Sequence, residues 1–181
     1  MTTIVADLRD GSIYTDSRAT YTSIRWTWKG RKKKIVGFEK SMKVFNLKGL
    51  LCARVGDVRG SNAIISLLEK KTYHENHKRV WKTLEGHSGG VVIVRPGYCI
   101  HLRVDDCGTM CRKVFFGNTN IRAFGSGCGA AILRNIGRNV KSNSILTKPV
   151  LLKIMKYNSL FDVYSDDEVV YSNQTLDYFV Y

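Results

Sequence analysis

The spacing of apolar and polar residues divides the chain into short strands separated by turn residues. The first stretch, Thr2–Leu8, is rich in β-branched residues, and the Arg9-Asp-Gly-Ser that follows it is typical of a hairpin turn. Turn residues at Lys48-Gly49 and Arg95-Pro-Gly predict two further hairpins, so the sheets are expected to be antiparallel. The remaining strands are predicted at Ile13–Thr15, Met42–Leu47, Leu50–Val55, Gly89–Val94, Tyr98–Val104, Val114–Phe116, Ile121–Phe124 and within Glu168–Tyr181.

Other stretches favour helices, and they fall between groups of strands. The predicted helices are Gly60–Lys71, Tyr73–Leu84, Gly129–Val140 and Lys148–Leu160, the last with Pro149 at its start. Two helix pairs separated by hairpin strands indicate an α+β fold, a four-layer αββα sandwich with helices outside two antiparallel sheets. Because no linker-like segment divides the chain, residues 1–181 are expected to form a single domain.

Composition excludes several classes of protein. The 181 residues are 44% hydrophobic, which excludes a disordered chain, and two prolines without any repeat exclude a collagen-like one. The apolar runs are too short to cross a membrane, and the first residues lack the pattern of a secretory signal. A cytoplasmic protein with no membrane partner is therefore expected.

The charge is strongly unbalanced. Lysine and arginine total 29 and aspartate and glutamate 15, a formal net charge of +14. A dense basic block follows Trp26 and Trp28 and consists of Lys29, Arg31, Lys32, Lys33 and Lys34. Aromatic rings beside lysines can stack on bases while the charges contact phosphate, so nucleic acid is one possible partner. Alternatively, the basic block extends into a ring pore, a partner interface or solvent.

The cysteines do not predict a metal site. Five cysteines without a secretory signal are expected to be free thiols. Cys107 and Cys111 have a loose metal-ligand spacing, with His74, His77 and His87 upstream. A zinc site usually has more closely spaced pairs, so no metal is predicted.

The N-terminus is a candidate for nucleophilic catalysis. Removal of Met1 is expected when the second residue is as small as Thr2, and it would leave a threonine with a free α-amine. A threonine hydroxyl is a weak nucleophile, and an amine with an unperturbed pKa of about 8 can act as its base. Alternatively, Thr2 only begins a β-branched strand.

Further segments strengthen the catalytic interpretation, because they form an ordered set. The segments are Asp16-Ser-Arg-Ala-Thr, Met42-Lys-Val, Leu50–Asp57, Gly125-Ser-Gly and Phe161-Asp-Val-Tyr-Ser. From Thr2 to about Ser165, this series resembles the β-type subunits of the proteasome and the bacterial peptidase HslV. The resemblance implies the N-terminal nucleophile (Ntn) hydrolase fold and a threonine endopeptidase that cleaves unfolded polypeptides.

The resemblance also implies the roles of individual residues. Thr2 matches the nucleophile, and its α-amine matches the base, acting through a water. Asp16 and Lys43 match a buried ion pair whose ammonium favours the alkoxide of the threonine. Either residue taken alone is better explained as a turn aspartate or a solvated lysine, and the catalytic interpretation is favoured only when both are taken together with Thr2. The residues that match the cluster orienting the amine are Ser126, Asp162 and Ser165.

Substrate contacts are expected from the strand before Gly56-Asp57. A backbone N–H of this strand would stabilise the oxyanion, and the alignment places either Ala53 or Arg54 at that position. Leu51 and Val55 would face the specificity pocket and favour apolar side chains at the cleaved position. The resemblance implies no metal or organic cofactor.

The chain departs from the family in three places. The segment between Asp16 and Lys43 is longer and contains the basic block as an extended hairpin, the usual oxyanion glycine is replaced, and Asp166-Asp167 stands in place of a glycine pair.

The expected partners are further copies in a ring and an ATPase ring that delivers polypeptide. Two alternatives remain: an inactive nucleic-acid-binding module, or a decoy that inhibits a host protease complex.

Overall fold

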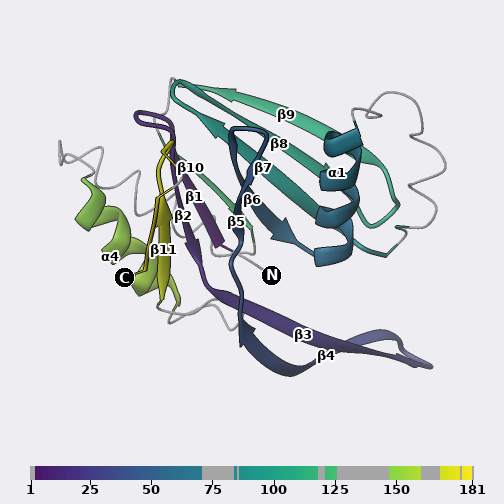
Figure 1. Cartoon of the computed structure of the whole chain (residues 1–181). Helices are drawn as coiled ribbons and strands as arrows, with labels where there is room; N and C mark the ends of the chain where they lie inside the picture. The colour runs from purple at the N-terminus through teal and green to yellow at the C-terminus, as the bar shows by residue number, and fades with distance from the viewer. Residues whose placement is uncertain are drawn as a thin grey trace.

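The computed structural model describes residues 3–70, 84, 86–117, 121–125, 147–159, 168–175 and 177–180. Its described part contains two five-stranded antiparallel sheets, a separate two-stranded hairpin and two helices (Figure 1).

The first sheet has the strand order β10-β1-β2-β11-β12. Thr3 at the start of β1 lies opposite Gly125 at the end of β10, and Asp16 at the end of β2 lies opposite Val169 at the start of β11. One end of this sheet therefore gathers the starts of β1 and β11 and the ends of β2, β10 and β12. The strands are β1 (Thr3–Asp7), β2 (Ser12–Asp16), β10 (Ile121–Gly125), β11 (Val169–Ser172) and β12 (Tyr178–Val180).

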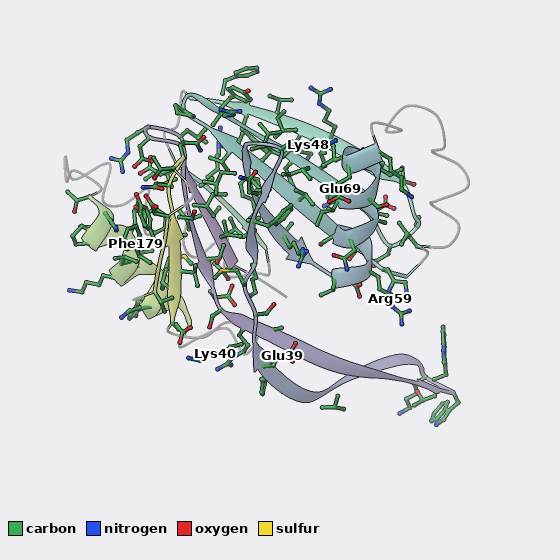
Figure 2. The ribbon with its side chains drawn as sticks, in the orientation of Figure 1. Glu39, Lys40, Lys48, Arg59, Glu69 and Phe179 are labelled. Atoms are coloured by element: carbon green, nitrogen blue, oxygen red, sulfur yellow. The ribbon has the colours of Figure 1, made fainter. Side chains whose placement is uncertain are left out.

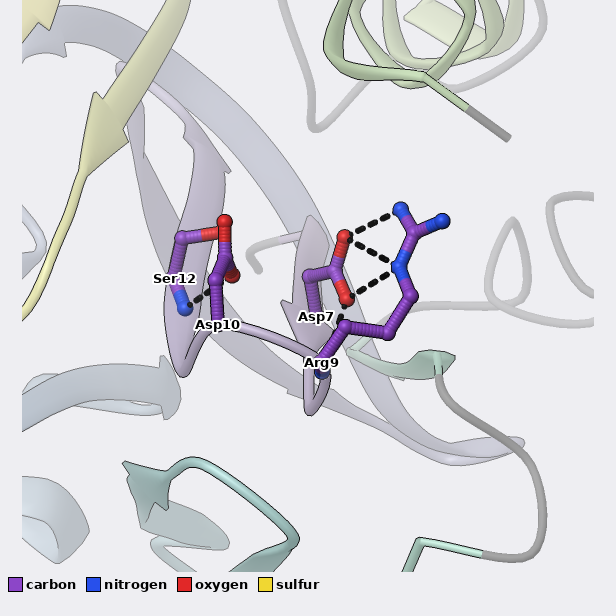
Figure 3. Close-up of polar contacts among 4 residues, drawn as sticks. All are labelled: Asp7, Arg9, Asp10 and Ser12. Carbon is purple, nitrogen blue, oxygen red and sulfur yellow. Dashed lines mark hydrogen bonds and ion pairs between the residues drawn. The ribbon is translucent and has the colours of Figure 1, made fainter. Parts of the chain in front are cut away.

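Hydrogen bonds to aspartate side chains fix the turn between β1 and β2 (Figure 3). The Asp7 carboxylate accepts hydrogen bonds from the Arg9 backbone N at 3.0 Å and from its Nε at 2.9 Å. Asp10 Oδ1 accepts one from the Ser12 backbone N at 2.9 Å. Gly11 has a φ of +75°, so the predicted hairpin closes at the residue that best tolerates this conformation.

The second sheet has the order β5-β6-β7-β8-β9. Its neighbouring strands are joined along the chain, except that α1 (Val58–Lys70) separates β6 from β7. The helix begins after Asp57, whose Oδ1 accepts a hydrogen bond from Arg59 N at 2.7 Å. Near its other end, Lys48 Nζ donates to the Glu69 carbonyl at 2.7 Å (Figure 2). The strands are β5 (Val44–Leu47), β6 (Leu50–Gly56), β7 (Gly89–Arg95), β8 (Tyr98–Val104) and β9 (Met110–Phe116).

Three apolar clusters hold these elements together. The cluster between the sheets joins side chains such as Ile4 and Ile13 to Leu51 and Val94. A second cluster packs α4 (Lys148–Ser159) against the first sheet and includes Leu151, Ile154, Met155, Val5 and Tyr14. The third packs α1 against the second sheet and includes Ile64, Leu67, Cys52 and Val91. Each sheet therefore has one described helix on its outer face.

The strands β3 (Arg18–Thr27) and β4 (Gly30–Lys40) form a hairpin that belongs to neither large sheet. Figure 1 shows it extending outward from the two sheets. The expected extended hairpin is therefore confirmed, and its two strands pair from Arg18 opposite Lys40 to Thr27 opposite Gly30. A shift of register lies between Tyr21 and Thr22.

Most predicted elements are present with changed ends. The first helix starts at Val58 rather than Gly60, because Asp57 caps it two residues earlier, and β9 starts at Met110 rather than Val114. The predicted helices Tyr73–Leu84, except Leu84, and Gly129–Val140 lie outside the described residues. A mixed fold with antiparallel sheets is thus confirmed. None of the helices in the described part is long and apolar enough to cross a membrane.

Candidate active site

A buried carboxylate stands at the centre of the candidate site. Asp16 is 1% exposed, and its Oδ1 accepts a hydrogen bond from the backbone N of Thr3 at 2.7 Å. Its Oδ2 accepts one from Lys43 Nζ at 2.5 Å. The pairing of Ile4 with Thr15 brings Asp16 level with Thr3 at the end of the sheet. Asp16 thus joins the first strand to a buried cation.

Lys43 reaches this carboxylate from the second sheet. Its carbonyl accepts a hydrogen bond from Arg54 N at 2.9 Å, which fixes its backbone beside β6. The side chain is buried, and its ammonium meets Asp16 at the end of the first sheet. The ion pair therefore connects the two sheets. Because an unpaired buried charge is very costly, each partner keeps the other in place.

The remaining residues of the predicted catalytic set are not described. Thr2, Ser126, Asp162 and Ser165 lie outside the described residues, and their roles stay predictions. Among the described residues, the structure brings Asp16 and Lys43 together.

The predicted substrate-binding residues belong to β6. Leu51, Ala53 and Val55 are buried in the cluster between the two sheets. Arg54 is half-buried, and its guanidinium lies 5.2 Å from the centre of the Phe45 ring. Its backbone N–H already donates to Lys43, so an oxyanion bond from Arg54 would have to replace that hydrogen bond. The predicted roles in substrate binding stay predictions.

The basic block lies in the hairpin. Lys29 is exposed in the turn, and Arg31, Lys32, Lys33 and Lys34 follow in β4. They are far along the hairpin from its base, where Arg18 lies opposite Lys40. The structure therefore separates the block from the Asp16–Lys43 pair along this hairpin.

Sequence reasoning missed two contacts near the candidate site. One is the hydrogen bond between Thr3 and Asp16, and the other is the ion pair between Lys40 and Glu168. Glu168 precedes Val169, which lies opposite Asp16, so this second pair is at the same end of the sheet. Both contacts depend on pairing between distant segments, for which the sequence has no local signal.

A half-buried histidine also lies between the sheets. The His101 ring is 5.0 Å from the centre of the Phe124 ring, and Phe124 lies opposite Ile4 of β1. Burial lowers the pKa of His101 to about 4, helped by the positive charges of Arg103 and Lys113. The imidazole is therefore neutral at neutral pH. In the sequence, His101 is a single histidine within a predicted strand, and no motif indicates that it lies between the sheets.

Four of the five cysteines are described, and all four are free thiols as expected. Burial raises the pKa of Cys52 to about 12 and that of Cys99 to about 11, so neither is a reactive thiolate at neutral pH. Within the described ranges, no group of three or more potential ligands is placed to hold a metal ion.

Comparison with known proteins shows that this chain is similar in fold to several solved structures. No family model and no curated protein matches the sequence. An Anbu (Gly-1) mutant from Hyphomicrobium sp. strain MC1 is similar with a TM-score of 0.53 and 13% identity, covering 98% of this chain and 84% of that one. A second Anbu structure from that strain has a TM-score of 0.55 and 10% identity, covering 100% and 86%. Anbu (ancestral beta-subunit) from Yersinia bercovieri has a TM-score of 0.50 and 10% identity, covering 99% of this chain and 86% of that one.

These structures correct the family suggested by the sequence. The assignment to the proteasome β-subunits and HslV is wrong, because the similar structures are of Anbu, a distinct family of ancestral beta-subunits. The motifs that suggested the other family are only a few residues long, and such short motifs carry little information about the rest of the chain. This chain has the fold of the Anbu structures.

Proposed function

We propose that this protein is a threonine-type endopeptidase in which Thr2, exposed by removal of Met1, is the nucleophile. One observation carries the proposal: the buried Asp16 carboxylate binds both the Lys43 ammonium and the backbone N–H of Thr3. Thr3 is bonded directly to the candidate nucleophile. Through the Asp16 carboxylate, the residue after Thr2 is thus linked to a buried cation of the kind that favours an activated hydroxyl.

A purely structural explanation accounts poorly for this pair. Removing two charges from water costs several kcal/mol per ion, and apolar residues of similar volume often stabilise a protein as well or better. Asp16 and Lys43 are nevertheless 1% and 5% exposed. Perturbed and buried charge pairs concentrate at functional sites. Their position at the start of β1, rather than in the middle of the core, favours a role in chemistry there.

The proposed reaction uses the groups of this chain alone. Thr2 Oγ attacks the peptide carbonyl carbon, and its proton passes through a water to the α-amine. The amine returns a proton to the leaving nitrogen as the peptide C–N bond breaks, which leaves an ester on Thr2. Water then cleaves the ester, releases the acid and restores the hydroxyl. Throughout, Lys43 favours negative charge on Oγ, and Asp16 keeps the lysine charged and oriented.

Three further residues are proposed to orient the α-amine: Ser126, Asp162 and Ser165. Strand pairing supports this, because β10 ends opposite Thr3 and β11 begins opposite Asp16. In the sequence, Ser126 directly follows the last residue of β10, and Asp162 and Ser165 precede the first residue of β11. The proposal includes a single domain with the four-layer αββα arrangement, supported by one helix on the outer face of each sheet.

The proposal extends to assembly. Similarity of fold to structures named ancestral beta-subunits supports self-association of this chain, and a ring of copies is the proposed form. Unfolded polypeptides are the proposed substrates. An ATPase ring that delivers them stays a prediction from sequence.

Intact-mass spectrometry after incubation with a peptide epoxyketone tests the nucleophile. This reagent closes a ring on both the hydroxyl and the free amine of an N-terminal threonine. We expect a mass that lacks Met1 and carries one inhibitor, and no modification of Thr2→Ala. A chain that retains Met1 and stays unmodified would contradict the proposal.

Peptide cleavage by a lysine variant tests the ion pair. Lys43→Ala should lose most activity, whereas the exposed Lys48, whose ammonium contacts the Glu69 carbonyl, offers a matched control in Lys48→Ala. Cleavage by Lys43→Ala within a few-fold of the unmodified protein would exclude the role proposed for this lysine. Unfolding midpoints of both variants separate lost activity from lost fold.

A further inference from the structure

The hairpin of β3 and β4, residues 18–40, is here called the arm. It pairs with neither large sheet and extends outward from them (Figure 1). An isolated two-stranded hairpin is at best marginally stable in water. Contacts at its base support it: Arg18 lies 4.7 Å over the Phe38 ring, and Lys40 forms an ion pair with Glu168. Glu39 and Lys40 are labelled at this base in Figure 2. At the outer end of the arm, residues 26–30 are exposed to solvent.

Two tryptophans are exposed at the tip of the arm. Trp26 is 80% exposed and Trp28 is 92% exposed, although rings of this size are usually well buried. Trp28 and Lys29 form a two-residue turn closed by a hydrogen bond from Thr27 Oγ1 to the Gly30 carbonyl at 2.9 Å. Lys29 Nζ lies 4.7 Å from the centre of the Trp28 ring. A large aromatic face and a cation are thus presented together.

The arm is also the most basic part of the chain. Its 23 residues contain eight basic side chains and one acidic side chain, a net charge of +7, or half of the +14 of the whole chain. Residues 25–34 contain six basic residues and no acidic one. The backbone register sets Arg25 opposite Lys32, so basic residues occur on both strands of the arm. Such a concentration of positive charge favours a polyanionic partner.

These observations identify the kind of partner. A second copy of the chain is disfavoured as the partner that the arm binds, because the residues outside the arm also carry a net charge of +7. Single-stranded nucleic acid combines a polyanionic backbone with unstacked bases, and proteins bind it by pairing basic side chains with aromatic stacking surfaces. We propose that the arm binds single-stranded nucleic acid, with phosphates on the basic residues and a base stacked on Trp28. This activity is independent of the proposed peptidase.

Salt dependence of binding tests the charge contacts. The probe is a fluorescein-labelled single strand of about 20 nucleotides, followed by anisotropy in the full-length protein. Neutralising Lys32, Lys33 and Lys34 to serine should reduce the slope of log affinity against log salt by about 2, at about 0.7 per phosphate contact. A matched triple serine variant removes three exposed lysines outside the arm, at Lys70, Lys113 and Lys153, and should leave the slope unchanged. Equal effects of the two triples would overturn the proposal.

Replacement of one tryptophan tests stacking. Trp28→Ala should weaken binding of the single strand about 5- to 150-fold with an unchanged salt slope, which corresponds to the loss of one stacked base. Phe116→Ala removes an aromatic ring that is 67% exposed on β9 and should have no effect. Affinity unchanged in Trp28→Ala would overturn the proposal.

Other polyanions serve as competing probes. Vesicles of phosphatidylcholine and phosphatidylglycerol, polyglutamate and a duplex of the same sequence are compared with the single strand. Tighter binding to any of them, with the same dependence on Trp28, would assign the arm to that partner and overturn the proposal. Cleavage of small peptides should be unchanged by both arm variants. The test therefore gives its answer whether or not the peptidase proposal holds.

Discussion

A double-mutant cycle at the buried ion pair separates its contribution to stability from its contribution to activity. Asp16→Asn keeps an oxygen that can accept the Thr3 N–H but removes the charge facing Lys43. Lys43→Met keeps much of the side-chain volume and removes the other charge. Each single variant leaves one charge buried without its ionic partner, whereas the double variant leaves none.

The magnitudes follow from burial, since both side chains of the pair are almost fully covered. Breaking a buried pair by removal of one partner costs about 3–5 kcal/mol, and replacement of both is often close to neutral. We expect each single variant to lose about 3–5 kcal/mol of unfolding free energy and the double variant to lose much less. The coupling energy between the sites should then be at least about 2 kcal/mol.

Urea unfolding of the four proteins measures the cycle, and peptide cleavage is measured on the same samples. Stability should return in the double variant while activity stays lost, because apolar and amide side chains cannot favour the alkoxide. Additive losses of stability in the two single variants would refute the coupling inferred from the structure. Activity that returned together with stability would refute the catalytic role of the pair.

Two further predictions concern the second sheet. A Cβ at Gly89 would lie 2.3 Å from the Asp57 carbonyl oxygen, so Gly89→Ala should destabilise the protein by about 2 kcal/mol or more in urea unfolding. Gly37 has open space around it, and Gly37→Ala should therefore leave the stability close to unchanged. The pKa of His101 is about 4 in the folded protein, against an ordinary value of 6.5. Between pH 6.5 and pH 4 the unfolded chain therefore binds more protons than the folded protein, so the stability of the fold falls as the pH is lowered through this range. From pH 7 to pH 5 this loss should be about 2 kcal/mol, and His101→Gln should lack it; an unchanged pH dependence in the variant would count against the burial of this imidazole.

Local residues were sufficient to predict most hairpins. Lys48 and Gly49 have φ values of 51° and +81°, a turn conformation that glycine adopts readily, and Gly97 has a φ of +86°. These turns connect strands that are adjacent in the sequence, so the signal and the structure lie in the same few residues. The pairings of β1 with β10 and of β2 with β11 join distant segments and have no such signal.

The ion pair of the candidate site was predicted only through a resemblance. Asp16 and Lys43 are 27 positions apart, and nothing in composition or spacing brings them together. The resemblance implied an ion pair between these two residues, which are in contact in the structure, but it led to the wrong family. The same short motifs were used for both inferences. Motifs of a few residues constrain the contacts of those residues far more than they constrain the remainder of the chain.

The ion pair also lies at the base of the arm, and this gives it a second physical role. Asp16 and Lys43 immediately flank the segment that contains the arm, and the Ser41 backbone N donates to the Ser17 carbonyl at 2.7 Å between them. If the pair served only to hold the base of the arm, loss of Lys43 would weaken nucleic-acid binding and leave the epoxyketone reaction of Thr2 intact. If it activates Thr2, the double variant should fail to react with the epoxyketone even though its stability is restored. Because Asp16 contacts Thr3 as well as Lys43, we expect the second result.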